Sequence, residues 1–441
     1  DVSLTHPPLP SPPVSYLVDP IASATITSRP DLFKIVTPIK VDRFAELLSD
    51  HPNQPFVRSV IRSLRYGFWP YTEEKPPTYP STWDAAGSPP RDEKAQVFLR
   101  EQRDEEVFAD RWSPAFGHDL LPGMVAMPLF AIPKPNSDKF RLINHLSYGK
   151  YSVNSLVPPE SIRGTVLDGV PALGDSLRQV AADFPDVSLL LWKSDVAHAY
   201  RNLPVAPQQQ LLQINTIDHL RHVDRNLPFG HRGSLKCWQA FNSLVIWIAE
   251  KKRSVHRISN YVDDSASGSP QDDLQWFEPF QQHIPSPLAR LLSLYDELGI
   301  PYDRRKQLWG PQLPYIGFLV DVDDFSFTFP EDRKLNLITA IEKFVSFSSD
   351  AHRRRTIHDF QALAGHISWS LNVFPLLRPC LANIYDKISG KSQPHAKAFI
   401  NNGIVRDLQW FLRHIQTLPG IRILATEAWT PADLDELSSE D

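Results

Sequence analysis

Three aspartates stand where metal-dependent phosphoryl chemistry could occur. Two of them, Asp263 and Asp264, are adjacent in the stretch "ISNYVDDSASGSP", residues 258–270. Neighbouring carboxylates repel each other, so the pair must be well solvated or neutralised by positive charge. One interpretation is a surface turn, because Asp-Asp beside Ser and Gly is ordinary loop composition. The other is a cation site at the tip of a hairpin.

The third carboxylate, Asp195, follows a continuous apolar run from Val187 to Trp192. Magnesium takes oxygen ligands, and two-metal nucleotidyl transfer needs carboxylates from different segments of the chain. A carboxylate at the end of a buried strand can face a cleft while the strand holds it rigidly. The competing interpretation makes Asp195 the N-cap of a helix that begins at "VAHAY".

Length and composition limit the kind of protein that could position these residues. The 441 residues suggest two to four structural units, and 42% hydrophobic with 11% aromatic residues is typical of a globular enzyme. A net charge of -5 argues against a globally basic nucleic-acid binder, although local basic surface can coexist with an acidic total. No apolar run is long enough to cross a membrane. Two cysteines support neither a disulfide framework nor a zinc site, which favours a reducing, intracellular compartment, cytoplasmic or nuclear.

The first 110 residues or so are predicted to form an N-terminal extension. Residues 1–30 are proline-rich and indicate an extended lead-in without a core of its own. A short helical piece follows, then a second proline-rich stretch and a charged helix candidate at 92–110. The chain begins with Asp1 and carries no signal-peptide pattern, so we expect it to be a segment of a longer polyprotein.

A mixed α+β centre and a helical C-terminal third are predicted to follow. Apolar residues at helical spacing predict a helix at 234–252 that Ser234 caps. Two alternating runs around Asp323 and Asp324 predict a hairpin. After Pro330 the pattern is helical, and the spacing Thr356-x-x-Asp359 predicts a capped helix.

Several stretches, in this order and spacing, resemble reverse transcriptases. "SDVAHAYRNLPV", "NLPFGHRGSLKCWQAF" and "NYVDD" resemble motifs A, B and C of that family. "AIPKPNSDKFRLINHLS" is similar to its finger segments, whereas "LGIPYDRRKQLWG" and "YIGFLV" resemble motif D and the primer grip. The resemblance covers roughly residues 120–390. The lead-in "HPNQPFVRSVIRSLRYGFWP" and the helical "DFQALAGHISWSLNVFPLLRPCLANIY" are most similar to tyrosine-recombinase (DIRS-like) retrotransposons of fungi.

The resemblance implies a right-hand polymerase fold of fingers, palm and thumb. Fingers and palm would occupy 111–325, with fingers at about 120–185 and 206–232 and palm at about 186–205 and 233–325. The thumb would follow at 326–390, and 391–441 would be a connection towards a ribonuclease H domain outside this chain. The implied activity is that of an RNA-directed DNA polymerase acting on RNA and DNA template-primers with dNTPs, and ribonuclease H and recombinase domains would be its neighbours in the polyprotein.

The resemblance also implies roles for the acidic residues. Asp195, Asp263 and Asp264 would hold two Mg²⁺ ions, with Mn²⁺ as a possible substitute, and the backbone carbonyl of Val196 would add a ligand. Lys306 would protonate the departing pyrophosphate, a role that needs only a positioned ammonium group. Arg304 and Arg305 are adjacent to Lys306, so an alternative interpretation is a basic surface turn that binds phosphate nonspecifically.

Nucleotide and template contacts are implied in the same way. The residues expected around the nucleotide are Lys134, Lys139 and Arg141 on its phosphates, Tyr200 as a steric gate against the ribose 2′-hydroxyl, and Phe229 and Gly230 beneath it. Those expected at the template-primer are Gln239, Tyr261, Gly317, Phe318, Arg353 and Arg354. The cations could instead form a solvated hairpin tip, and Tyr200 could be a core aromatic.

One residue departs from the family pattern, because His145 stands where relatives usually have Asp. This departure leaves one alternative to an active reverse transcriptase open, and the shared palm leaves a second. The first is a decayed or domesticated fold that only binds nucleic acid. The second is an RNA-dependent RNA polymerase, which shares the palm but ordinarily has Gly-Asp-Asp and a polar residue where Tyr200 stands.

Overall fold

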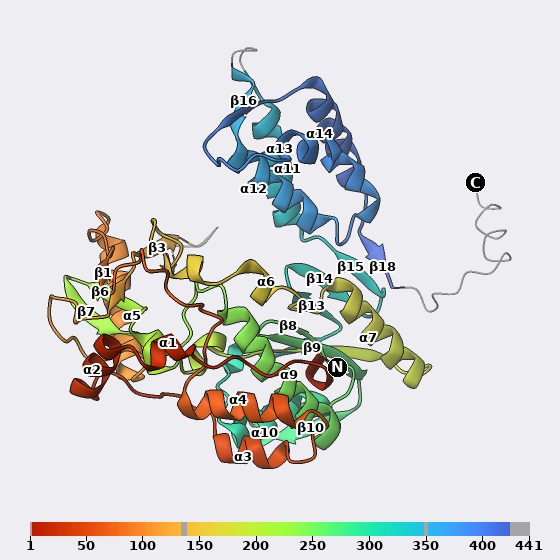
Figure 1. Ribbon diagram of the computed structural model, residues 1–441. Helices are drawn as coiled ribbons and strands as arrows, with labels where there is room; N and C mark the ends of the chain where they lie inside the picture. Colours follow the sequence, from red (N-terminus) through yellow and green to blue (C-terminus); the bar gives the residue numbers. More distant parts are fainter. Residues whose placement is uncertain (1, 134–138, 348–351, 424–441) are drawn as a thin grey trace, which may run out of the picture. The chain divides into compact units, whose positions relative to one another are not determined.

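The computed structural model describes residues 2–133, 139–347 and 352–423 (Figure 1). The chain forms two compact units, each built from three segments. The first unit comprises Asp1–Leu167, Asp195–His256 and Pro287–Lys306. The second comprises Asp168–Ser194, Arg257–Ser286 and Gln307–Asp441.

The first unit is mainly helical and carries a small sheet of strand order β1-β2-β6-β7 and a separate β3-β4 hairpin. Its helices are η1 (Val2–Leu4), α1 (Val14–Leu17), α2 (Pro20–Ser28), α3 (Val41–Leu47), α4 (Gln54–Tyr66), α5 (Glu93–Phe108), η2 (Val153–Leu156), α6 (Pro159–Ile162), η3 (Ala199–Asn202), α8 (Pro207–Gln210), α9 (Ser234–Lys252), α10 (Ser286–Leu298) and η5 (Arg304–Lys306). Its strands are β1 (Trp83–Asp84), β2 (Val125–Ala126), β3 (Leu129–Pro133), β4 (Phe140–Asn144), β6 (Ile214–Ile217) and β7 (Leu220–Val223).

The N-terminal residues are not the extended lead-in that their prolines predict. They form η1, α1 and α2, and Asp19 caps α2 by accepting from the backbone N–H groups of Ile21 and Ala22. Tyr16 is buried in a cluster with Trp69, and its hydroxyl donates to the Glu73 carbonyl at 2.9 Å. The prediction of an extended conformation was wrong. The segment has no separate core, as predicted, because its apolar side chains pack into the first unit.

The second unit contains a sheet of strand order β12-β5-β9-β8. A second sheet has the order β13-β14-β15-β18. The helices are α7 (Val170–Asp183), η4 (Glu278–Phe280), α11 (Glu331–Val345), α12 (Ile357–Ser370), η7 (Pro375–Leu381), α13 (Ala382–Ile388) and α14 (Asn402–Ile415). The strands are β5 (Leu189–Asp195), β8 (Ser259–Tyr261), β9 (Asp264–Pro270), β10 (Leu274–Phe277), β11 (Gln282–Pro285), β12 (Leu308–Gly310), β13 (Gln312–Tyr315), β14 (Phe318–Asp321), β15 (Ser326–Thr328), β16 (Arg354–Thr356), β17 (Lys397–Phe399) and β18 (Ile421–Arg422).

Several sequence predictions are confirmed element by element. The helix predicted at 234–252 is α9, although Ser234 does not cap it: its hydroxyl donates to the Pro228 carbonyl at 2.9 Å. The hairpin around Asp323 and Asp324 is the antiparallel pair β14-β15. Thr356 forms a full capping box at the start of α12. In the C-terminal third the pairing of β16 with β17 was not expected.

The described residues include no helix long and apolar enough to cross a membrane. Cys237 and Cys380 are both buried free thiols. The predicted limits of extension, fingers, palm and thumb stay a prediction, because division into compact units does not test them.

Candidate active site

The Asp263-Asp264 pair lies on the β8-β9 hairpin, as expected. Tyr261 pairs with Asp264 across the two strands, so Val262 and Asp263 form a two-residue loop. Val262 has a φ of +58°, in the left-handed region. For a β-branched residue this is an outlier that costs about 1–3 kcal/mol, and such strain concentrates at functional sites. The hairpin therefore contains a strained turn.

A lysine neutralises one of the two adjacent carboxylates. Lys193 Nζ, on β5, lies 3.0 Å from Asp264 Oδ1, and the two side chains are 16% and 18% exposed. The repulsion between Asp263 and Asp264 is thus partly relieved by an ammonium group on the neighbouring strand. Sequence reasoning missed Lys193, although a lysine inside the apolar run "LLLWKSD" was a signal, since alternation places it on the same face as Asp195.

Asp195 is the last residue of β5 and also pairs with a lysine. Lys306 Nζ, in η5, lies 2.7 Å from Asp195 Oδ1. The alternative that Asp195 caps a helix is wrong, since the N-cap of η3 is His198. The next residue, Val196, forms an isolated antiparallel bridge with Tyr302. The structure therefore brings two of the predicted catalytic residues, Asp195 and Lys306, into direct contact.

The donor chemistry suits an oxygen-preferring divalent cation. The strand that ends in Asp195 neighbours β9, whose first residue is Asp264. Carboxylate oxygens are the ligands that Mg²⁺ prefers. Within the described residues no three His, Cys, Asp or Glu side chains are arranged to hold a metal ion. Lys306 contacts Asp195 and Lys193 contacts Asp264, so a metal ion would have to compete with these ammonium groups for the carboxylates.

Tyr200 faces an aromatic partner in the first unit. It lies on η3, after His198 with a φ of +62°. Its ring centroid is 5.0 Å from that of Phe229 and 6.4 Å from that of Trp238. Phe229 is 46% exposed, whereas Trp238 is fully buried. Tyr200 and Phe229, which are both predicted to border the nucleotide, therefore lie together. The Phe229 ring is at the surface, and the buried Trp238 ring also lies near Tyr200.

Gly230 is required by a close backbone approach. Its φ is +116°, and a Cβ there would lie 2.2 Å from the Asn144 carbonyl oxygen. The structure places the end of β4 against this glycine, and the predicted contact of Gly230 beneath the nucleotide stays a prediction. Asn154 Nδ2 donates to the Gly230 carbonyl at 2.8 Å and fixes the turn from the other side.

His231, next in the chain, is a buried neutral imidazole. The Gly233 backbone N–H donates to Nδ1 at 3.1 Å, and the Gln209 side-chain amide lies 3.4 Å from Nε2. Burial lowers the pKa of His231 from 6.5 to about 3. The imidazole therefore positions the start of α9 without carrying charge.

The structure describes two of the three cations that are predicted to contact the nucleotide phosphates. Lys134 lies outside the described residues, whereas Lys139 and Arg141 are exposed. Arg141 is on β4, paired in register with Ile132 on β3, so the predicted hairpin is confirmed. His145 follows β4, where its ring centroid is 5.8 Å from that of Phe130 and 5.7 Å from that of Tyr148.

Gln239, in the first unit, is the only predicted template contact on α9. It is partly buried, and its Nε2 has no hydrogen-bond partner among the described residues. An amide nitrogen left in this way can donate to a ligand. The predicted contact with the template strand stays a prediction.

The predicted primer grip lies in the second unit. Gly317 has a φ of +96°, and a Cβ there would meet Arg333 Nη1 at 2.3 Å. The Phe318 ring is fully buried and stacks on Trp369 at 5.5 Å, and Tyr261 lies 6.4 Å from the same indole. The Phe318 side chain is thus a core residue, and the predicted primer contact of this turn stays a prediction.

The two arginines predicted to meet duplex phosphates differ in their surroundings. The Arg353 guanidinium carbon lies 4.9 Å from the Phe347 ring centroid and 5.2 Å from that of Phe399, and Nη2 donates to Asn402 Oδ1 at 2.7 Å. Arg354 is exposed. Arg353 is therefore in contact with other residues of the second unit, whereas Arg354 is exposed. Their predicted contacts with duplex phosphates stay a prediction.

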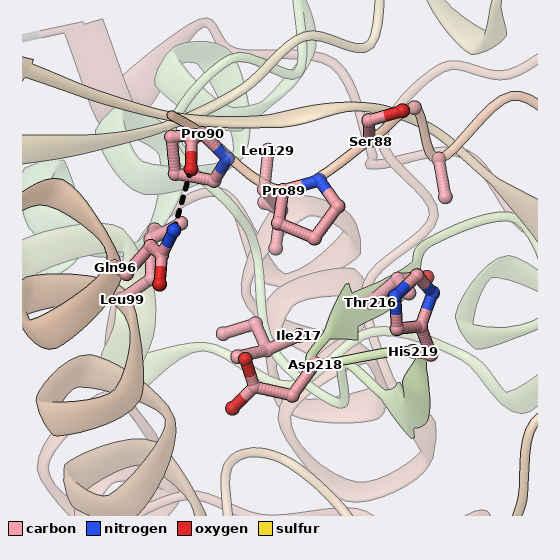
Figure 2. Close-up of a pocket in the computed structure, with 12 residues that line it drawn as sticks. Ser88, Pro89, Pro90, Gln96, Leu99, Leu129, Thr216, Ile217, Asp218 and His219 are labelled. Carbon is pink, nitrogen blue, oxygen red and sulfur yellow. Dashed lines mark hydrogen bonds between the residues drawn. The ribbon is translucent and has the colours of Figure 1, made fainter. Parts of the chain in front are cut away.

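A pocket in the first unit is distinct from these residues (Figure 2). The loop Ser88–Pro90, two residues of α5 and the β6-β7 turn line it. Gln96 Nε2 donates to the Pro90 carbonyl at 2.8 Å, and Arg100 binds Asp218 at 2.8 and 3.0 Å. None of the predicted site residues lines it, so it is not the candidate active site.

Comparison with solved structures identifies the fold. The chain superposes on a foamy viral protease-reverse transcriptase in complex with double-stranded DNA with a TM-score of 0.52 at 16% identity, covering 89% of this chain and 62% of that one. The same kind of protein with an RNA/DNA hybrid gives a TM-score of 0.52 at 16% identity, covering 86% of this chain and 46% of that one. No family model and no curated protein matches the sequence. The mixed helix and sheet architecture is that of a reverse transcriptase polymerase fold, and the chain spans less than two thirds of the length of the first of these structures.

Proposed function

We propose that the chain is an RNA-directed DNA polymerase that adds deoxynucleotides to a primer 3′-end. The observation that carries the proposal is the strained β8-β9 hairpin with Asp263 and Asp264, in one sheet with the strand that ends in Asp195. Its setting in a reverse transcriptase fold supports it, since the similar solved proteins are complexes with DNA and with an RNA/DNA hybrid.

In this proposal the three aspartates and the Val196 carbonyl hold two Mg²⁺ ions. When bound, the ions would stabilise charge on the attacking and leaving oxygens of an in-line displacement. Lys306 supplies the proton for the departing pyrophosphate, because its ammonium group already lies at Asp195. Tyr200 excludes a ribose 2′-hydroxyl, and Lys134, Lys139 and Arg141 bind the phosphates. The affiliation with fungal tyrosine-recombinase elements and the intracellular location rest on the sequence alone.

Primer extension on an RNA template with Mg²⁺ tests this function. D263N should abolish extension, since the neutral amide removes the negative charge that lets this position bind Mg²⁺ tightly. D323N is the matched control, because Asp323 and Asp324 form a second Asp-Asp turn, in the β14-β15 hairpin. If wild-type protein folds and binds template-primer but extends no primer with Mg²⁺ or Mn²⁺, the proposed function is refuted.

A second candidate is a fold that binds nucleic acid without catalysis. The two lysine–aspartate pairs favour it, because Lys193 and Lys306 already neutralise two of the three carboxylates. Isothermal titration with Mg²⁺ separates the two candidates. Binding that D263N removes supports the polymerase, and template-primer binding without any carboxylate-dependent metal binding supports the second candidate.

A further inference from the structure

A buried group of charged side chains lies directly beside Tyr200, and the proposed reaction does not use it. Arg201 Nη2 donates to Glu106 Oε2 at 2.6 Å, and Arg201 Nη1 lies 2.9 Å from Asp224 Oδ1. The Arg201, Glu106 and Asp224 side chains are 7%, 10% and 1% exposed. Arg111 also binds Glu106, at 2.8 and 2.9 Å.

The group contains two guanidinium groups and two carboxyl groups. Burial raises the pKa of Asp224, and the Arg201 guanidinium opposes that shift. Burial alone would raise the pKa of Glu106, but Arg201 and Arg111 outweigh it and lower the pKa to about 2. Buried ion pairs contribute little net stability, because desolvation opposes their attraction. A planar guanidinium that bridges two carboxylates instead fixes the geometry of the groups around it, which is what a positioning residue must do.

Arg201 also binds the backbone that leads to Phe229. Its Nη1 donates to the carbonyl oxygens of Asn226 at 3.1 Å and Leu227 at 3.3 Å. The Leu227 backbone N–H in turn donates to the Leu203 carbonyl at 3.0 Å. One side chain thus joins the segment that carries Tyr200 to the segment that carries Phe229.

We propose that Arg201 is a positioning residue that sets the separation of the Tyr200 and Phe229 rings and through it the selection of deoxyribose over ribose. The inference rests on the proposed polymerase function. It also assigns a role to α5, because Glu106 on that helix holds one arm of Arg201. A lysine cannot substitute, since one ammonium group cannot hold two carboxylates and two carbonyls in the same fork.

The test compares R201K and E106Q with a matched control, R221K. Arg221 is also largely buried and multiply bonded, to Asp84, to the Thr216 hydroxyl at 2.7 Å and to the His118 carbonyl at 2.8 Å, but no described bond joins its side chain to the Tyr200 or Phe229 segment. Primer extension gives kcat/KM for a dNTP and for the matching rNTP. A second readout needs no activity: 3-fluorotyrosine at position 200 reports the ring environment by ¹⁹F NMR.

R201K should lower the dNTP-to-rNTP ratio of kcat/KM by about tenfold or more, because small misplacements at a reacting centre have large effects. E106Q should lower it in the same direction, and it tests the inference should R201K fail to fold. Both should shift the ¹⁹F resonance, whereas R221K should change neither readout. A ratio or a ¹⁹F shift that stays at the wild-type value in R201K and E106Q overturns the inference. Wild-type protein that extends no primer refutes the polymerase function instead, and the ¹⁹F comparison still decides whether Arg201 positions Tyr200.

Discussion

The buried imidazole of His231 should make the protein less stable in mild acid. Burial lowers its folded-state pKa to about 3, whereas the ordinary value is 6.5. The unfolded chain therefore takes up a proton first, so the contribution of His231 to stability is complete above pH 6.5 and is lost as the pH falls towards 3. Between pH 7 and pH 5 the loss from this one group is about 2 kcal/mol, from the linkage relation with 1.36 kcal/mol per pKa unit.

Urea unfolding at pH 7 and pH 5, followed by tryptophan fluorescence, measures this loss. Compared with wild type, H231Q should be less stable at pH 7, but its free energy of unfolding should fall by about 2 kcal/mol less between the two pH values. T72V is the matched control. The Thr72 hydroxyl donates to Gln209 Oε1 at 2.9 Å, so the variant weakens the same hydrogen-bond chain and keeps the imidazole. It should lower stability equally at both pH values. If wild type and H231Q lose the same free energy between pH 7 and pH 5, the reasoning is refuted.

Three further predictions concern backbone geometry. G230A should lower stability by about 2 kcal/mol and raise the KM for dNTP, because its Cβ would meet the Asn144 carbonyl oxygen at 2.2 Å; an unchanged melting temperature and KM would contradict this. V262G should change the free energy of unfolding by less than about 1 kcal/mol, since relieved strain offsets the added backbone freedom, yet slow primer extension by loosening Asp263. T356A should cost about 1 kcal/mol through the lost capping box without altering extension, and a loss of extension would show that Thr356 does more than cap α12.

Local patterns predicted the elements well, because the sequence itself carries their causes. The apolar spacing of 234–252 and the Thr356-x-x-Asp359 box each reappear as α9 and the start of α12. The β8-β9 hairpin that carries Asp263 and Asp264 was predictable for the same reason, since its strands and its turn lie within a few residues of one another in the sequence. Its strain was not, because the φ of Val262 depends on how β8 and β9 pair.

Contacts between distant segments of the chain could not be predicted from the sequence. The pairs Lys193–Asp264 and Lys306–Asp195 join residues far apart in the chain, and no motif spacing indicates which charge meets which. Phe318 matches the primer-grip pattern, yet its ring is in the core, because a motif gives residue type and not burial. The helices of the first thirty residues were not predicted, because the high proline content indicated an extended segment although its apolar residues pack into the first unit.

The interleaving of the two units has a consequence for how the chain can fold and be dissected. The backbone passes from one unit to the other at 167–168, 194–195, 256–257, 286–287 and 306–307. No single cut releases either unit whole, so truncation at one site leaves both incomplete. During synthesis the first unit lacks α10 until residues near 306 have emerged, whereas domains made of one continuous segment can fold as soon as they appear. We therefore expect early chaperone dependence and cooperative unfolding, and expression of a separate unit would require circular permutation or linked fragments.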